Sequence, residues 1–137
     1  MPQWLFKQEP SCYSFQNLLA DGCTTWDGVN NALAQKHLRN VKKNDRVFYY
    51  HTGKDKAVVG IIRVTADPMP DSNDPSGKQV VLTVEPVRPL RHPVTLAAIK
   101  AEELFASWEL VRMSRLSVMP VSEEIWNRIE AMSEKGA

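Results

Sequence analysis

The sequence predicts an α+β domain built on a small mixed β-barrel with short peripheral helices. Segments rich in β-branched and aromatic residues are interspersed with short helical patterns, without the regular strand and crossover helix of a parallel sheet. No glycine-rich phosphate loop follows any predicted strand. A chain of 137 residues, 43% of them hydrophobic, is long enough for one core without disulfide or metal staples. We therefore expect residues 1–137 to form a single domain.

The first part of the chain predicts one strand followed by two helices. The strand "QWLFK" (3–7) should stop at Glu9-Pro10, because proline donates no backbone hydrogen bond and disfavours helix in the residue before it. Ser14 is placed to cap a short helix, "FQNLLA", which ends at an Asp-Gly pair. Apolar residues at helical spacing then run from Val29 to Val41 and indicate a second, amphipathic helix.

The remainder of the chain predicts most of the sheet. "RVFYYH" and "AVVGIIRVTA" read as adjacent antiparallel strands joined by the turn "TGKDK". The segment "DPMPDSNDPSGK" reads as a mobile surface loop, and "QVVLTVEPVRPL" as a long strand whose Pro86 and Pro89 indicate an edge or a bulge. Thr95 should cap one or two helical turns, "RLSVMPV" is the last strand, and Ser122 caps a closing helix.

The charge balance excludes a generally cationic surface. Lys and Arg number 17 against 16 Asp and Glu, for a net charge of +1, so any contact with a polyanion must be local. Cys12 and Cys23 match no zinc or redox spacing, and no secretory segment follows Met1, so we expect a cytoplasmic protein. No apolar run approaches membrane-spanning length, and we expect no membrane partner.

Five motifs in fixed order carry a resemblance to a known family. The stretches "WLFKQEP", "WDGVNN", "YYHT", "VVGIIRV" and "RLSVMPV" resemble those of the EVE domain family, from about Gln3 to Met132. The resemblance implies a PUA-like barrel, related to the YTH domains that read methylated adenine, with a cleft that accepts a modified base in DNA or RNA. Asn30 stands where the family has an Arg, so a forked charged donor is lost there. Gln8 replaces the usual Ser, whereas Asn31 matches the family Asn.

The motif around Trp26 is the main candidate for base binding. A flipped or unpaired base is held by aromatic stacking and by hydrogen bonds to its edges. Trp26 would form the stacking wall, a contact worth about 1 to 3 kcal/mol per base, unless it is a core residue. Asn31 and Asn30 would present amides to the base edge, with helix capping as the alternative. The other tryptophans lie in strand or helix patterns and are expected in the core: Trp4, Trp108 and Trp126.

Five further residues are candidates at the barrel mouth. Tyr50 and His51 end a strand and could form a second wall, although neighbouring strand residues face opposite sides, so one of them is structural unless a bulge intervenes. Lys7 could contact a phosphate or a base oxygen, or be solvated. Arg115 and Ser117 should share one face of the last strand, with Arg115 as a phosphate or base contact or a surface ion pair.

The sequence offers no catalytic or metal constellation. Cys23, Asp27 and His51 could be drawn as a thiol triad, but no local signature supports one. The histidines at 37, 51 and 92 lack ligand spacing, and both zinc deaminase signatures are absent. We therefore expect a monomeric, non-enzymatic reader of a modified or flipped base, without a cofactor. Two alternatives stay open: an enzyme acting on modified nucleotides, and a small-molecule or protein-interaction domain that never binds polynucleotide.

Overall fold

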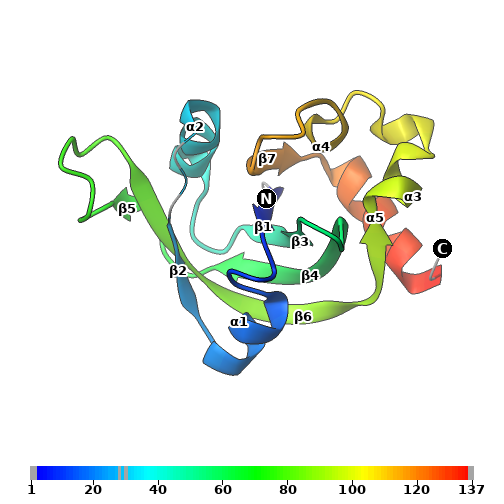
Figure 1. The fold of residues 1–137 in the computed structure, drawn as a ribbon, viewed down its shortest axis with the longest axis horizontal. Coiled ribbons are helices and arrows are strands. Elements are labelled where there is room, and N and C mark those ends of the chain that lie inside the picture. Colours follow the sequence, from blue (N-terminus) through cyan, green and yellow to red (C-terminus); the bar gives the residue numbers. More distant parts are fainter. Residues whose placement is uncertain (1–2, 28, 30, 136–137) are drawn as a thin grey trace.

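The described residues form one mixed sheet that curls into a half-barrel. The computed structural model describes residues 3–27, 29 and 31–135. Its seven-stranded sheet has the order β2-β6-β4-β3-β1-β7, with β5 paired to β6. β1 runs parallel to β3, and every other pair is antiparallel. Figure 1 shows the long β6 curving beneath the other strands, with short helices around the barrel. The predicted fold class is confirmed.

The bounds of the elements show where each lies along the chain. The strands are β1 (Gln3–Gln8), β2 (Thr24–Trp26), β3 (Arg46–His51), β4 (Ala57–Val64), β5 (Met69–Pro70), β6 (Val80–Thr95) and β7 (Val118–Val121). The helices are α1 (Phe15–Asp21), α2 (Ala32–Asn40), α3 (Leu96–Lys100), the 3-10 turn η1 (Glu103–Phe105), α4 (Glu109–Arg112) and α5 (Glu123–Lys135). None of the described helices combines the length and apolar character needed to cross a membrane.

Local capping signals place three helices where the sequence predicts them. The Ser14 hydroxyl accepts from the backbone N–H of Asn17, and α1 ends at Gly22, whose φ of 81° is a left-handed conformation that glycine adopts without strain. The Thr95 hydroxyl accepts from Ala98 N–H at the start of α3, at 3.1 Å. Ser122 does the same for the first turn of α5. These helices therefore begin at their predicted caps.

Several boundaries differ from the predictions. α2 begins at Ala32 rather than near Val29, because Asn31 is its cap. The segment 67–78 is not wholly irregular, since β5 within it pairs with β6. β6 extends to Thr95, with irregular register against β4 beside its prolines, as expected of a strand that tolerates Pro at bulges. The strand predicted from residue 115 begins only at Val118, because residues 113–116 close a turn first.

Three of the four tryptophans are buried in the core, and the indole N–H of each donates a hydrogen bond. Trp126 is fully buried and stacks on Phe48, with ring centroids 3.7 Å apart. Each indole N–H of these residues has an acceptor: Trp4 donates to Asp45, Trp108 to the Pro120 carbonyl and Trp126 to Glu130. Buried polar groups need such partners. The prediction that these three are core residues is confirmed.

Candidate functional site

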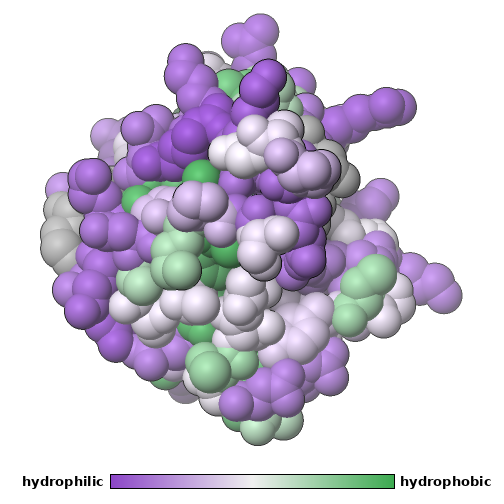
Figure 2. Space-filling view, turned by 90° about the vertical axis from the view of Figure 1, so that its left-hand side faces the viewer, coloured by the Kyte–Doolittle hydropathy of each residue, from purple (hydrophilic) through white to green (hydrophobic). Residues whose placement is uncertain are grey.

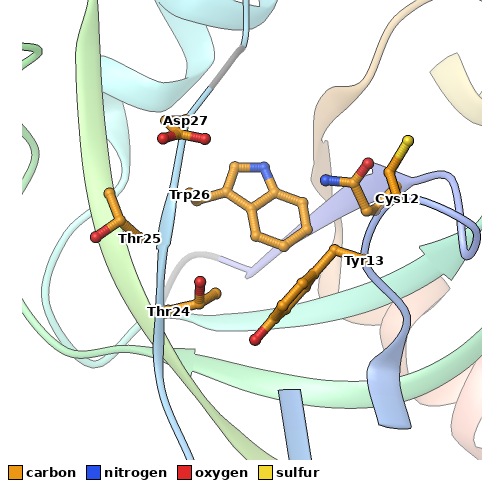
Figure 3. A pocket seen from close by; sticks show the side chains of 7 residues that line it. Cys12, Tyr13, Thr24, Thr25, Trp26 and Asp27 are labelled. Carbon is orange, nitrogen blue, oxygen red and sulfur yellow. The ribbon is translucent and has the colours of Figure 1, made fainter. Parts of the chain in front are cut away.

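A pocket opens between the end of β1, the loop before α1, and β2. Its volume is about 240 Å³, smaller than the roughly 300 to 1,000 Å³ of drug-sized sites. β2 pairs antiparallel with β6, with Trp26 opposite Leu82, so the sheet fixes the strand that carries one wall. The lining residues, six of which are labelled in Figure 3, are Gln8, Cys12, Tyr13, Thr24, Thr25, Trp26 and Asp27. A pocket of this size suits one small planar group.

Trp26 belongs to the core and to the pocket wall at once. Its side chain is 4% exposed, and its ring packs against Phe6 at 5.3 Å and edge-on against Tyr49 at 5.4 Å. It still lines the pocket, and Figure 3 shows the indole projecting from β2 toward Tyr13. Among the described residues its indole N–H has no hydrogen-bond partner, unlike those of the other three tryptophans. That N–H is free to donate to a ligand.

Tyr13 supplies a second aromatic surface, and hydrogen bonds fix its position. Its hydroxyl donates to Asp21 at 2.6 Å, and its backbone carbonyl accepts from the Tyr49 hydroxyl at 2.5 Å. Burial raises the pKa of the Tyr13 hydroxyl, with a further contribution from the hydrogen bond to Asp21. Burial also raises the pKa of Tyr49. Both phenols therefore stay protonated at neutral pH and hold the pocket in one geometry.

Gln8 and Asp27 give the pocket a donor and an acceptor. The Gln8 side-chain oxygen accepts from the Glu9 backbone N–H at 3.0 Å, which leaves its NH₂ group as a donor. Asp27 is exposed, and an ionised carboxylate only accepts. The sequence prediction did not name Gln8, Asp27 or Tyr13 as binding residues. The only available signal for Gln8 was its departure from the family Ser.

The predicted site residues do not gather around one pocket. Lys7 and Tyr50 line a second pocket of about 270 Å³. Asn31 and Arg115 line a third, of about 370 Å³, between α2 and the turn before β7. Arg115 and Ser117 precede β7 instead of sharing a face of it, which corrects that prediction. Ser117 contributes its carbonyl, which accepts from the Lys7 backbone N–H at 2.9 Å, and Asn30 lies outside the described residues.

His51 is held by structural hydrogen bonds. Its Nε2 accepts from the Phe15 backbone N–H at 3.0 Å, and its Nδ1 lies 3.0 Å from a carboxylate oxygen of Asp55. Both ring nitrogens are therefore occupied, and His51 cannot serve Cys23 as a base in the thiol triad considered from the sequence. The β3–β4 register shifts between Tyr49 and Tyr50, and Tyr50 and His51 are both buried. Within the described residues, no three His, Cys, Asp or Glu side chains cluster as a metal site.

Asn31 caps α2, and this role predicts the effect of its removal. Its side-chain oxygen accepts from the Ala34 backbone N–H at 3.0 Å. We expect Asn31→Ala to lower the free energy of unfolding by about 1 kcal/mol, and Asn31→Asp, which keeps the accepting oxygen, to leave it nearly unchanged. Urea denaturation of the three proteins measures this. Equal stability of Asn31→Ala and the wild type would show that the cap contributes nothing.

The face around β2 has a mixed surface. Figure 2 shows the side of the molecule that carries β2 and β5, with pale and green side chains in its middle and purple hydrophilic side chains around them. A weakly polar centre with a hydrophilic border can bury a ring while leaving charged groups in water. This side of the molecule is therefore compatible with contact to a flat, partly apolar group.

Comparison with known proteins identifies the family. The sequence model of the EVE domain matches residues 3–132. The chain belongs to the EVE domain family. Human thymocyte nuclear protein 1 is 26% identical to it over 166 residues, which cover 96% of this chain and 74% of that protein. The resemblance drawn from the five motifs is thus confirmed.

Solved structures of relatives support the same fold. An NMR structure of a protein from Rhodopseudomonas palustris is 40% identical, with a TM-score of 0.93 over 98% of this chain and 94% of that one. A crystal structure of human thymocyte nuclear protein 1 is 25% identical, with a TM-score of 0.90 over 98% of each chain. That human protein was crystallised in complex with DNA containing 5-methylcytosine. The PUA-like architecture expected from the motifs is confirmed.

Proposed function

We propose that this protein is a DNA-binding domain that holds a modified cytosine, of which 5-methylcytosine is the leading candidate, in the Trp26 pocket. The observation that carries the proposal is the placement of a donor, Gln8, and an acceptor, Asp27, in one small pocket beside two aromatic rings. The complex of the human relative with 5-methylcytosine DNA supports the choice of ligand. RNA carrying the same base is the comparison that the experiments must include.

The pocket chemistry matches the edge of a flipped cytosine. Cytosine offers an N4 amino donor, which Asp and Glu carboxylates accept, next to the ring N3 and O2 acceptors. Asp27 would accept from the amino group, and the Gln8 NH₂ would donate to N3 or O2. Trp26 and Tyr13 would contact the base faces, because stacking contributes affinity for any base. Adenine offers the same adjacent pair, the N6 amino donor and the N1 acceptor, but it has no counterpart of cytosine O2. Gln8 therefore selects cytosine over adenine only by donating to O2, and the small pocket favours the smaller pyrimidine ring.

The methyl group itself adds only modest selectivity. A missing methyl in an apolar niche costs about 1 to 3 kcal/mol, or roughly 10- to 200-fold in affinity. Cys12 and the methyl group of Thr24 are the least polar groups beside the rings. We therefore expect a preference for methylated over unmodified cytosine near the lower end of that range, with most of the affinity supplied by stacking and edge contacts.

Removing the polar pair tests the proposal. We expect Asp27→Ala and Gln8→Met each to weaken binding of a 5-methylcytosine oligonucleotide by about 10-fold or more, since each leaves a base group unpaired. Asp27 is exposed, so its variant should keep wild-type stability. Binding is measured by fluorescence anisotropy against DNA and RNA oligonucleotides that carry cytosine, 5-methylcytosine or N6-methyladenine.

The sign of the Asp27 effect separates direct contact from general electrostatics. Removing a negative charge should tighten the binding of any polyanion if only long-range charge mattered. Glu124→Ala, which removes an exposed carboxylate on α5, is the matched control and should bind no more weakly than the wild type. If Asp27→Ala also binds as well as the wild type, or if N6-methyladenine DNA competes equally, the cytosine assignment is wrong.

A further inference from the structure

A second pocket, at the ends of β1 and β3, concentrates positive charge. Three lysines from three separate elements line it: Lys7 from β1, Lys56 from the β3–β4 turn and Lys100 from the end of α3. Tyr50 and Thr52 also face this pocket of about 270 Å³. The net charge of the chain is only +1, so this grouping is a local property of the fold.

Lys7 is half-buried without a carboxylate to neutralise it. Its ammonium donates to the Ser114 carbonyl at 2.9 Å and lies 5.6 Å from the ring centroid of Tyr50. No ion pair joins it to any described Asp or Glu. Burial lowers its pKa, as expected when water is withdrawn from an ammonium group. An anion in the pocket would offset the cost of that desolvation.

Lys56 and Lys100 line the same pocket from two elements that a backbone hydrogen bond joins. Lys56 has a φ of 42°, a left-handed conformation that side chains other than glycine adopt at a cost. Its carbonyl accepts from the Leu96 backbone N–H at 2.7 Å, which ties the turn to α3 and so to Lys100. Both lysines also line an adjoining hollow of about 300 Å³. The fold therefore places two exposed ammonium groups in the same pocket as the half-buried Lys7.

Two carboxylates lie beside these pockets, and each contacts another polar group. Asp55, which lines the adjoining hollow, contacts the ring of His51, and Glu9 accepts from the Thr52 hydroxyl at 3.0 Å. By contrast, arginines of β4, β6 and α5 are neutralised in pairs: Arg63 with Glu85, Arg88 with Glu130, Arg91 with Glu134 and Arg128 with Glu102. Lys56 and Lys100, like Lys7, form no such pair with a described carboxylate.

We infer that the pocket lined by Lys7, Lys56 and Lys100 binds a phosphate group of the nucleic-acid strand whose base occupies the Trp26 pocket. The inference rests on the proposed function. The two pockets adjoin through directly bonded residues, because the Thr52 backbone N–H donates to the Gln8 carbonyl at 3.0 Å. Gln8 lines the base pocket and Thr52 the lysine pocket. Because Lys7 and Gln8 face opposite sides of β1, the nucleic-acid strand would pass around the ends of β1 and β3 to place a base in one pocket and a phosphate in the other.

The Lys56→Gln/Lys100→Gln double variant tests the phosphate site. Both lysines are exposed, so the variant should fold. We expect several-fold weaker binding of the 5-methylcytosine oligonucleotide at low salt, and a slope of log affinity against log salt that is shallower by about 1 for each lysine in phosphate contact. Lys42→Gln/Lys43→Gln, which changes two exposed lysines before the opposite end of β3, is the control and should keep the wild-type slope.

Two further titrations separate this inference from the proposed function. The free nucleoside 5-methyl-2′-deoxycytidine carries no phosphate, so it should bind the Lys56/Lys100 variant as well as the wild type. Inorganic phosphate should shift the NMR signals of the lysine ammonium groups in the wild type at millimolar concentration. If the double variant matches its control in affinity and slope, no phosphate of the nucleic-acid strand occupies this pocket, whatever the base preference.

The remaining outcomes are also decisive. If the lysine pair sets the salt slope but no base is preferred, the proposed function fails and the phosphate site stands. If inorganic phosphate shifts the lysine signals but oligonucleotides bind independently of the pair, the pocket takes a free phosphate and its assignment to the strand is overturned.

Discussion

Trp26→Ala is expected to abolish base-dependent binding and to lower the free energy of unfolding by about 3 to 5 kcal/mol. Both effects follow from its double position, since the ring packs on Phe6 and Tyr49 while it lines the pocket. Loss of one stacking wall removes about 1 to 3 kcal/mol of binding, and collapse of the neighbouring rings removes more. Isothermal titration with a 5-methylcytosine oligonucleotide and urea denaturation measure the two effects.

A matched core variant separates the loss of binding from the loss of stability. Trp108 is 3% exposed and lines no wall of the Trp26 pocket, so Trp108→Ala should cost similar stability but leave the affinity within about twofold of the wild type. Trp26→Phe keeps an aromatic face and removes only the N–H and the second ring, so it should retain stacking and a folded pocket. If the Trp26→Phe and Trp108→Ala variants lose affinity equally, the stacking role of Trp26 is refuted.

Local signals in the sequence predict the elements that local chemistry determines. Ser14, Thr95 and Ser122 each cap a helix because a side-chain oxygen can reach an N–H two or three residues ahead, which needs no information from distant residues. The β3–β4 hairpin follows from two β-rich runs and a short polar turn. These features are therefore readable from the chain alone.

Pairings between distant segments cannot be read in the same way. β1 pairs in parallel with β3, across about forty residues, and the two-residue β5 exists only because β6 offers it an edge. Residues 113–116 form a turn, so β7 begins only at Val118, although "RLSVMPV" has strand composition throughout. Tertiary context overrides local propensity at these points.

In the candidate site too, local sequence predicts some residues, whereas contacts between distant segments determine the others. Trp26 could be predicted because its motif is contiguous, but Gln8 and Tyr13 reach it from a different part of the chain. Lys7 and Gln8 are neighbours in sequence, yet they line different pockets because successive strand residues face opposite sides. The lysine pocket depends on a turn, a strand and a helix that no spacing rule relates.

Gly60→Ala is expected to destabilise the protein by about 3 kcal/mol, the upper part of the range for overpacked cores. A β-carbon at this position would lie 2.5 Å from two ring carbons of Phe15, which is 2% exposed. The ring cannot withdraw easily, because Phe15 packs edge-on against Tyr49 and its backbone N–H donates to His51. The glycine of "VVGIIRV" thus leaves room for the first residue of α1.

A double-mutant cycle with Phe15→Leu tests this steric cause. Leucine lacks the outer ring carbons that would meet the new methyl group, so Gly60→Ala should cost at least about 1 kcal/mol less in the Phe15→Leu background than in the wild type. Urea denaturation of the four proteins gives the coupling free energy. A displaced Phe15 ring would push on Tyr49, whose hydroxyl donates to the carbonyl of the pocket residue Tyr13. Gly60→Ala should therefore also weaken base binding, although Gly60 does not line the pocket. Equal costs in both backgrounds would mean that the Phe15 ring is not what the glycine accommodates.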